Sequence, residues 1–273
     1  MDRSAVVSIE QIEREAWLDL FSVAPAQFVN DWGAQSVRLP AAAVFGLREA
    51  PLVEFNRALG IGVEQQPSEE ELDRVTAWLR THGNSAWALQ IAPVACSEAL
   101  LRWMEHSGLK ADGSGVAKFQ RGPSQAADYS LQSDFEIHAV APHDAALFGT
   151  VVQAGFDAPP AFASWFSGLV GRPRWRIYLV YDGNNPVASG AMFIDRGWAW
   201  TGIDATLPAY RRRGAQAALL SRRISDGLAA GVAGFTGETD RPGVGREASQ
   251  SSYRNFLRAG FHVAYIRENY CPA

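Results

Sequence analysis

The segment Gly202–Ser225, GIDATLPAYRRRGAQAALLSRRIS, decides how the second half of this 273-residue sequence is interpreted. A predicted strand, Trp198–Thr206, leads into it, and Pro208 ends that strand. A helix is predicted over residues 214–230, because its apolar positions recur at helical spacing and give one face that can pack on a sheet. Those positions are Ala217, Leu220, Ile224 and Leu228.

The predicted helix begins with the opposite of the usual charge. Helix starts favour Ser, Thr, Asp or Asn caps and early carboxylates, because unpaired N–H groups and the helix dipole attract negative charge. Here Arg211, Arg212 and Arg213 come first, and Gly214 allows a ligand to approach the backbone. Free amides of residues 213–216 and the guanidinium groups would suit a pyrophosphate. A solvated arginine cluster before a surface helix is the alternative that the spacing leaves open.

Composition excludes several classes of function. The sequence is 47% hydrophobic and 20% charged, which is the balance of a folded globular protein. Its net charge of −4 gives no overall positive field for nucleic acid or an anionic membrane, so we expect neither as a partner. Neither of its two lysines, Lys110 and Lys118, follows a glycine as a P-loop requires.

The sequence also predicts no metal site and no export. Cys96 and Cys271 lie too far apart for paired ligands, and the five histidines show no metal-binding spacing. The N-terminal residues lack the apolar core and cleavage site of a signal peptide, and no apolar run approaches 18 residues. A cytoplasmic location is therefore expected.

The arginine-rich turn resembles the signature of the GNAT acetyltransferase superfamily, which is Gln or Arg, two residues, Gly, one residue, then Gly or Ala. The sequence Arg211-Arg212-Arg213-Gly214-Ala215-Gln216 fits it except at Gln216, whose side chain would lie near the cofactor. The resemblance implies that this loop cradles the pyrophosphate of acetyl-CoA. It also implies that Asp204, Ala205 and Thr206 line the pantetheine arm.

A second resemblance lies in Ser249–Phe261. The superfamily commonly has Asn-x-x-Ser-x-x-x-Tyr-x-x-x-Gly-Phe here, and its Tyr protonates the departing thiolate. Ser252, Gly260 and Phe261 match, but Phe256 occupies the Tyr position and Ser249 the Asn position. Tyr253 lies one helical turn earlier and is the candidate acid, with a packed or surface tyrosine as the alternative.

The resemblance predicts an α/β (α+β) fold of two tandem GNAT-like domains, each a mixed, mostly antiparallel twisted sheet flanked by helices. Residues 134–273 would form the acetyltransferase domain, residues 123–133 the linker, and residues 1–122 a degenerate domain. Both halves end with a strand, Val116–Arg121 and Phe261–Arg267, after a helix that stops at glycine. The first half has acids in place of the phosphate loop, so we predict that it does not bind the cofactor.

The resemblance implies an N-acetyltransferase that moves an acetyl group from acetyl-CoA, as co-substrate, to a primary amine of a small or amino-acid-like acceptor. Asp204 and Glu238 are candidate bases, each with a structural role as the alternative. A catalytically silent acyl-CoA sensor or scaffold is the competing hypothesis. An aromatic run, Phe156 to Phe166, is interpreted either as core or as a wall of the acceptor site. The oligomeric state stays open, a homodimer included.

Overall fold

A computed structural model describes residues 2–125 and 135–273. Contacts divide the chain into two compact units: unit 1 comprises Met1–Ala117 and Ala264–Ala273, and unit 2 comprises Lys118–Val263. Most of the expected linker, 123–133, lies outside the described residues. Among the described helices, none combines the length and the apolar character needed to cross a bilayer.

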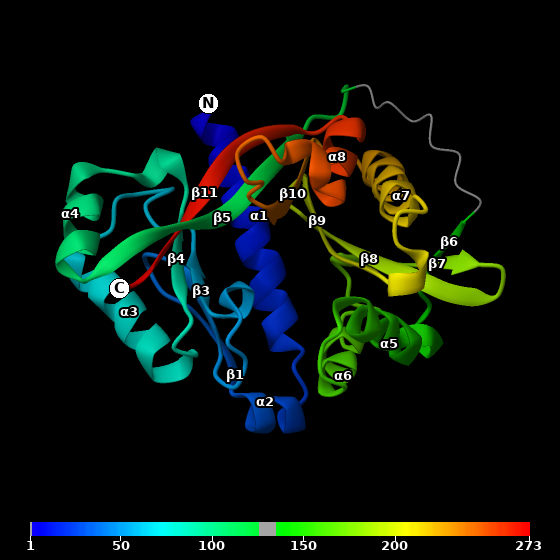
Figure 1. The fold of residues 1–273 in the computed structure, drawn as a ribbon, viewed down its shortest axis with the longest axis horizontal. Coiled ribbons are helices and arrows are strands. Elements are labelled where there is room, and N and C mark those ends of the chain that lie inside the picture. Colours follow the sequence, from blue (N-terminus) through cyan, green and yellow to red (C-terminus); the bar gives the residue numbers. More distant parts are fainter. Residues whose placement is uncertain (1, 126–134) are drawn as a thin grey trace. The chain divides into compact units, whose positions relative to one another are not determined.

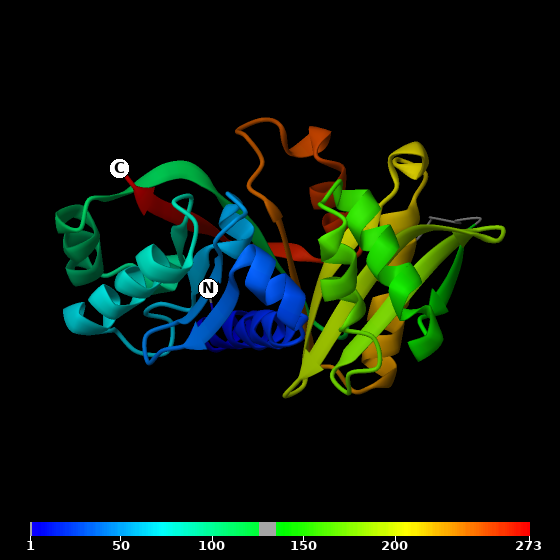
Figure 2. The same cartoon turned by 90° about the horizontal axis from the view of Figure 1, so that it is seen from below.

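Unit 2 holds the arginine-rich turn. Its elements are β6 (Glu136–Ala139), α5 (Ala145–Phe156), α6 (Ala161–Ser167), β7 (Trp175–Asp182), β8 (Asn185–Asp195), β9 (Trp198–Thr206), α7 (Ala215–Ala229), β10 (Gly234–Asp240) and α8 (Ser251–Arg258). The strands lie in the order β10-β9-β8-β7-β6. Helices α5 and α6 cover one face of β8 and β9, and α7 and α8 lie on the other (Figures 1 and 2). The predicted limits of β9 are confirmed.

Helix α7 is anchored by a buried apolar face, which includes Ala217, Leu220 and Ile224 as predicted but not Leu228, which is 38% exposed. Ala215 and Leu219 pack with Tyr178, Val180 and Val187 of the adjacent strands, all of them buried. The phenol of Tyr178 donates a hydrogen bond to Asp226 at 2.8 Å. Burial, and then this hydrogen bond, raises the pKa of Tyr178 well above its usual value, so the phenol remains a donor. These contacts fix where the start of α7 lies.

The strands β9 and β10 part halfway along their length. They run parallel and pair from Trp198 with Gly234 as far as Thr201 with Gly237. In the described chain their ladder stops there, although β9 continues to Thr206. A bulge lies at the same point, where Ile203 has a φ of +57° and β9 gains one residue relative to β8. One backbone edge of β9 is therefore no longer paired with β10.

Unit 1 has the same order of helices and strands as unit 2 from α5 onward. Its elements are α1 (Arg3–Ser22), α2 (Ala26–Trp32), β1 (Ala34–Arg38), β2 (Ala43–Leu47), β3 (Arg57–Leu59), α3 (Glu69–His82), β4 (Ala88–Ile91), α4 (Glu98–His106) and β5 (Leu109–Arg121). Two helices, three strands, a helix, a strand, a helix and a strand thus occur in both halves. The predicted fold class, a mixed, mostly antiparallel sheet flanked by helices, is confirmed.

The last strand of each half passes out of its own unit. β11 (His262–Pro272) begins in unit 2, but from Ala264 onward it belongs to unit 1, where it pairs antiparallel with β4. β5 begins in unit 1, and its residues from Lys118 belong to unit 2, where β5 neighbours β10. The structure therefore divides the chain differently from the expected ranges 1–122 and 134–273, because the end of β11 pairs with β4 and the end of β5 neighbours β10.

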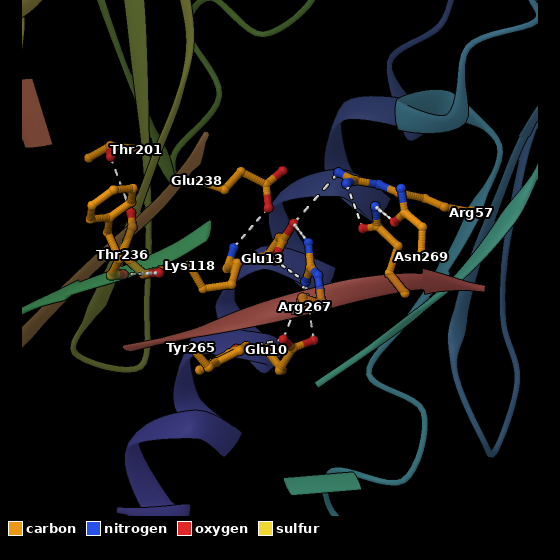
Figure 3. Close-up of polar contacts among 12 residues, drawn as sticks. Glu10, Glu13, Arg57, Lys118, Thr201, Thr236, Glu238, Tyr265, Arg267 and Asn269 are labelled. Atoms are coloured by element: carbon orange, nitrogen blue, oxygen red, sulfur yellow. Dashed lines mark hydrogen bonds and ion pairs between the residues drawn. The ribbon is translucent and has the colours of Figure 1, made fainter. Parts of the chain in front are cut away.

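Buried ion pairs hold β11 inside unit 1. Arg267 of β11 lies between two glutamates of α1, with its Nη1 atom 2.7 Å from Glu13 and 3.3 Å from Glu10 (Figure 3). Tyr265 also donates to Glu10, at 2.6 Å. Arg267, Glu10 and Glu13 are at most 1% exposed. Buried charges of this kind are tolerated only when paired, so the network specifies where β11 lies.

A capping box at the start of α3 gives a first stability test. Ser68 accepts a hydrogen bond from the Glu71 amide at 3.2 Å, and its own amide donates to the Glu71 carboxylate at 2.8 Å. We expect Ser68→Ala to lower the free energy of unfolding by about 1 kcal/mol in urea titrations. Ser8→Ala in α1 removes a hydroxyl that donates to the Ser4 carbonyl, and it should change this free energy by less than about 0.5 kcal/mol. Equal stability of both variants would contradict the cap.

Candidate acyl-donor groove

The turn between β9 and α7 leaves backbone donors exposed. Pro208–Tyr210 form a short 3-10 turn, Arg212 has a φ of +64°, and Gly214 caps α7 with a φ of +92°. A side chain at Gly214 would be strained in this left-handed conformation. No side chain of the described residues caps α7, and no acid lies in its first turn. Within the described residues, the amides of 214–217 donate no hydrogen bond, as an anion site requires.

These amides border a groove of about 620 Å³ in unit 2. The end of α5, the splayed part of β9, the turn, the first turn of α7 and one face of α8 form its walls. The lining residues are Gly155, Phe156, Asp204, Thr206, Tyr210, Arg211, Arg212, Gly214, Ala215, Gln216, Ala217, Ser251, Ser252, Arg254, Asn255 and Arg258. Seven of the nine residues predicted to bind the cofactor, Asp204 included, therefore line one groove.

The three consecutive arginines have different surroundings. Arg211 donates to the carbonyls of Thr206 at 3.2 Å and Gly155 at 2.9 Å, which holds its guanidinium beside the end of β9. Arg212 is exposed and lines the groove. Arg213 does not line it, because its guanidinium pairs with Asp182 at 3.0 Å and lies over the Tyr210 ring. Two of the three predicted cations thus face the groove.

The predicted arm-binding strand is held in place from both faces. Ala205 is buried, and a Cβ atom at Gly155 would lie 2.7 Å from that of Ala205, so only glycine lets α5 approach β9 this closely. Asp204 forms an ion pair with the fully buried Arg223, at 2.6 Å and 2.9 Å. Its carboxylate is therefore engaged by the protein, which favours the structural alternative for this residue.

Gln216 connects the walls of the groove. Its amide nitrogen donates to Ser252 at 2.7 Å and to Asp204 at 3.4 Å, and its oxygen accepts from Asn255 at 2.8 Å. The residue that departs from the family signature thus joins α7, β9 and α8. The sequence could not reveal these partners, because they lie 12 to 39 positions away.

Removing this bridge should loosen α8. We expect Gln216→Ala to lower the free energy of unfolding by about 1–2 kcal/mol, because Asn255 and Ser252 lose half-buried hydrogen bonds. The measurement is urea unfolding of the whole chain. Gln27→Ala, which removes one exposed bond to Asp31, should cost less than about 0.5 kcal/mol. A Gln216→Ala protein as stable as the unaltered chain would show that the bridge contributes nothing.

The remaining catalytic candidates lie outside the groove lining. Glu238 follows the last residue of β10 that pairs with β9. The fully buried ammonium of Lys118 lies 3.0 Å from the Glu238 carboxylate (Figure 3). Tyr253 packs edge-on against Phe119, at 5.2 Å between ring centroids. Phe256, at the family's Tyr position, is 2% exposed and stacks on Phe119 at 4.7 Å. That position therefore offers no hydroxyl.

Two other predictions concern aromatic residues and metals. Phe162, Trp165 and Phe166 are buried in unit 2, which supports the core alternative for the aromatic run, while Phe156 is exposed and borders the groove. Among the described residues, no group of three His, Cys, Asp or Glu side chains is arranged to hold a metal ion.

Several solved structures share this fold. A GCN5-related N-acetyltransferase from Sphaerobacter thermophilus has a TM-score of 0.58 at 19% identity, over 78% of this chain and 70% of that one. One from Kribbella flavida has a TM-score of 0.57 at 15% identity, over 90% and 92%. A functionally unknown conserved protein from Staphylococcus epidermidis has a TM-score of 0.54 at 14% identity, over 89% of this chain and 96% of that one. No family model and no curated protein matches the sequence. Identities this low support a shared fold and no more. The activity therefore depends on the geometry of the groove.

Proposed function

The chain has the fold of the GCN5-related N-acetyltransferases, and we propose that unit 2 transfers an acetyl group from acetyl-CoA to a primary amine of a small molecule. One observation supports this above all. The amides at the start of α7 donate no hydrogen bond within the described chain. Together with Arg211 and Arg212 they line a groove that the splayed end of β9 borders. Free N–H groups, guanidiniums and an unpaired strand edge are the donors that a pyrophosphate and an amide-bearing arm need.

Each part of the groove has a separate role in the proposed transfer. Bound acetyl-CoA supplies the acetyl thioester, whose C–S bond breaks as the amine nitrogen forms a C–N bond, while the nitrogen loses a proton and the sulfur gains one. The start of α7, with Arg211 and Arg212, holds the diphosphate. The backbone of Asp204–Thr206 orients the arm and polarises the carbonyl through an N–H. Orientation of the two reactants contributes more than proton transfer in such reactions.

For proton transfer we propose Glu238 as the base, acting through water, with Lys118 fixing its carboxylate. Asp204 then positions the strand through Arg223 rather than removing a proton. With phenylalanine at position 256, the departing thiolate takes its proton from water or from Tyr253. Comparison of Tyr253→Phe with the unaltered chain distinguishes these two sources, since only the second predicts a large loss of kcat.

The direct test measures thiol release from acetyl-CoA across a panel of primary amines, after binding of acetyl-CoA has been measured by calorimetry. We expect at least one amine to raise thiol release above the amine-free rate. Glu238→Gln should lower kcat by about 10²- to 10⁴-fold without weakening acetyl-CoA binding. Failure of the unaltered chain to bind acetyl-CoA would refute the proposal.

A second candidate is a catalytically silent acyl-CoA-binding protein. The observation in its favour is the buried Phe256 at the position where the family carries its acid. This candidate predicts the same binding of acetyl-CoA, but no amine in the panel would then release thiol. Binding and turnover, measured on the same protein, therefore separate the two functions.

A further inference from the structure

Two arginines of α8 extend the groove beyond the site proposed for the diphosphate. Arg254 and Arg258 are exposed, lie one helical turn apart and both line the groove, as do Ser251 and Asn255 of the same helix. Side chains four residues apart on a helix project from the same face, so both guanidiniums can reach one ligand. A ligand-binding role for these two arginines rests on the function proposed above, because they would bind a second part of the same ligand.

The groove is cationic within an acidic chain. Its lining contains four arginines, Arg211, Arg212, Arg254 and Arg258, and one acid, Asp204. That acid is already paired with Arg223, which is fully buried. The chain as a whole has a net charge of −4. The positive charge is therefore local, and it favours a ligand with more than one anionic group.

Neither Arg254 nor Arg258 has an ion-pair partner among the described residues, and α8 contains no acidic residue. Like charges four residues apart destabilise a helix by a few tenths of a kcal/mol. Arg258 gains from the negative end of the helix dipole, but Arg254, in the middle of α8, does not. The arrangement is therefore one that a bound anion would relieve.

The number of charges indicates which anion. A diphosphate diester carries two negative charges, which Arg211, Arg212 and the start of α7 can neutralise. A phosphate monoester carries about −1.5 to −2 at neutral pH and presents three acceptor oxygens, which suits two further guanidiniums. We infer that Arg254 and Arg258 bind the 3′-phosphate of CoA, so that the groove selects free CoA thioesters over donors that lack this monoester.

This selection has a chemical consequence. 3′-Dephospho-CoA keeps the diphosphate, the adenosine and the arm, and loses only the monoester. A phosphopantetheine arm carried on a protein lacks the diphosphate as well. The donor is accordingly a free acyl-CoA rather than an acyl group attached to a carrier protein.

The test compares dissociation constants of CoA and 3′-dephospho-CoA by calorimetry at one fixed ionic strength. The unaltered chain should bind CoA at least about tenfold more tightly, the size expected for charge-assisted hydrogen bonds. In the double variant Arg254→Gln/Arg258→Gln, this ratio should fall to about 1–2, because the affinity for CoA falls while that for 3′-dephospho-CoA is retained. Arg74→Gln/Arg102→Gln, on exposed helix positions of unit 1, changes the net charge equally and should keep the full ratio.

Two results would overturn the inference. One is an equal affinity of the unaltered chain for CoA and 3′-dephospho-CoA. The other is a double variant that binds CoA and 3′-dephospho-CoA more weakly by the same factor, which would place these arginines at the diphosphate. Circular dichroism of each variant confirms that a lost preference is not lost folding. If the unaltered chain binds neither ligand, the proposed function itself fails, and this outcome is distinct from a ratio of one.

Discussion

Replacement of Arg211 and Arg212 with glutamate is expected to weaken acetyl-CoA binding by at least about 100-fold. Both side chains line the groove, so the double variant removes two attractive charges and adds two repulsive ones beside the amides of α7. Arg211 also holds the carbonyls of Thr206 and Gly155, and its loss loosens the wall of the groove. Calorimetric titration with acetyl-CoA measures the effect.

Arg213 provides the matched control, because it is adjacent in sequence but faces elsewhere. Its guanidinium pairs with Asp182 and lies over the Phe135 and Tyr210 rings. We expect Arg213→Gln to change acetyl-CoA affinity by less than about threefold, since an exposed ion pair contributes little. If Arg213→Gln and the double variant lose the same affinity for acetyl-CoA, the three arginines act through their overall charge rather than through specific contacts with the ligand.

Substitution of Arg267 with methionine is expected to lower the free energy of unfolding by about 3–5 kcal/mol. The change leaves Glu10 and Glu13 buried without the guanidinium that pairs with both of them. Arg57, the other buried arginine of the network, lies 3.6 Å from Glu13 and compensates only in part. Urea unfolding of the whole chain, followed by tryptophan fluorescence, measures the loss.

An exposed arginine supplies the comparison for this variant. Arg102 on α4 is two-thirds exposed and lies 3.9 Å from Glu98, so Arg102→Met should change stability by less than about 0.5 kcal/mol. Should Arg267→Met unfold at the same urea concentration as the unaltered chain, β11 would not depend on this network for its place in unit 1.

Local signals in the sequence predicted the elements that form the groove. The apolar positions 217, 220 and 224 of α7, the Pro208 break and the limits of β9 depend on nearby residues, and the structure confirms them, whereas Leu228 at the end of the predicted stripe is exposed. The capping box of α3 is equally local, because it depends on two residues three positions apart. The fold class could also be predicted, because the order of strands and helices restricts the layers that can form.

Long-range contacts could not be predicted in this way. The passage of β5 and β11 into the other unit depends on pairing between strands more than 100 residues apart, for which no local pattern exists. The partners of Gln216 and the ion pair between Arg213 and Asp182 are likewise decided by the fold. Arg254 and Arg258 had a sequence signal, two cations at helical spacing, but only the structure shows that they line the groove.

The start of α7 is the proposed site for the diphosphate of acetyl-CoA, and amide hydrogen exchange would detect a ligand bound there. Amides of 214–217 donate no hydrogen bond within the described chain and should exchange rapidly without ligand. We predict that saturating acetyl-CoA slows exchange in a peptide spanning these residues, while a peptide from α3 in unit 1 is unchanged. Acetyl-CoA that binds without slowing exchange at 214–217, or that protects only unit 1, would contradict the claim.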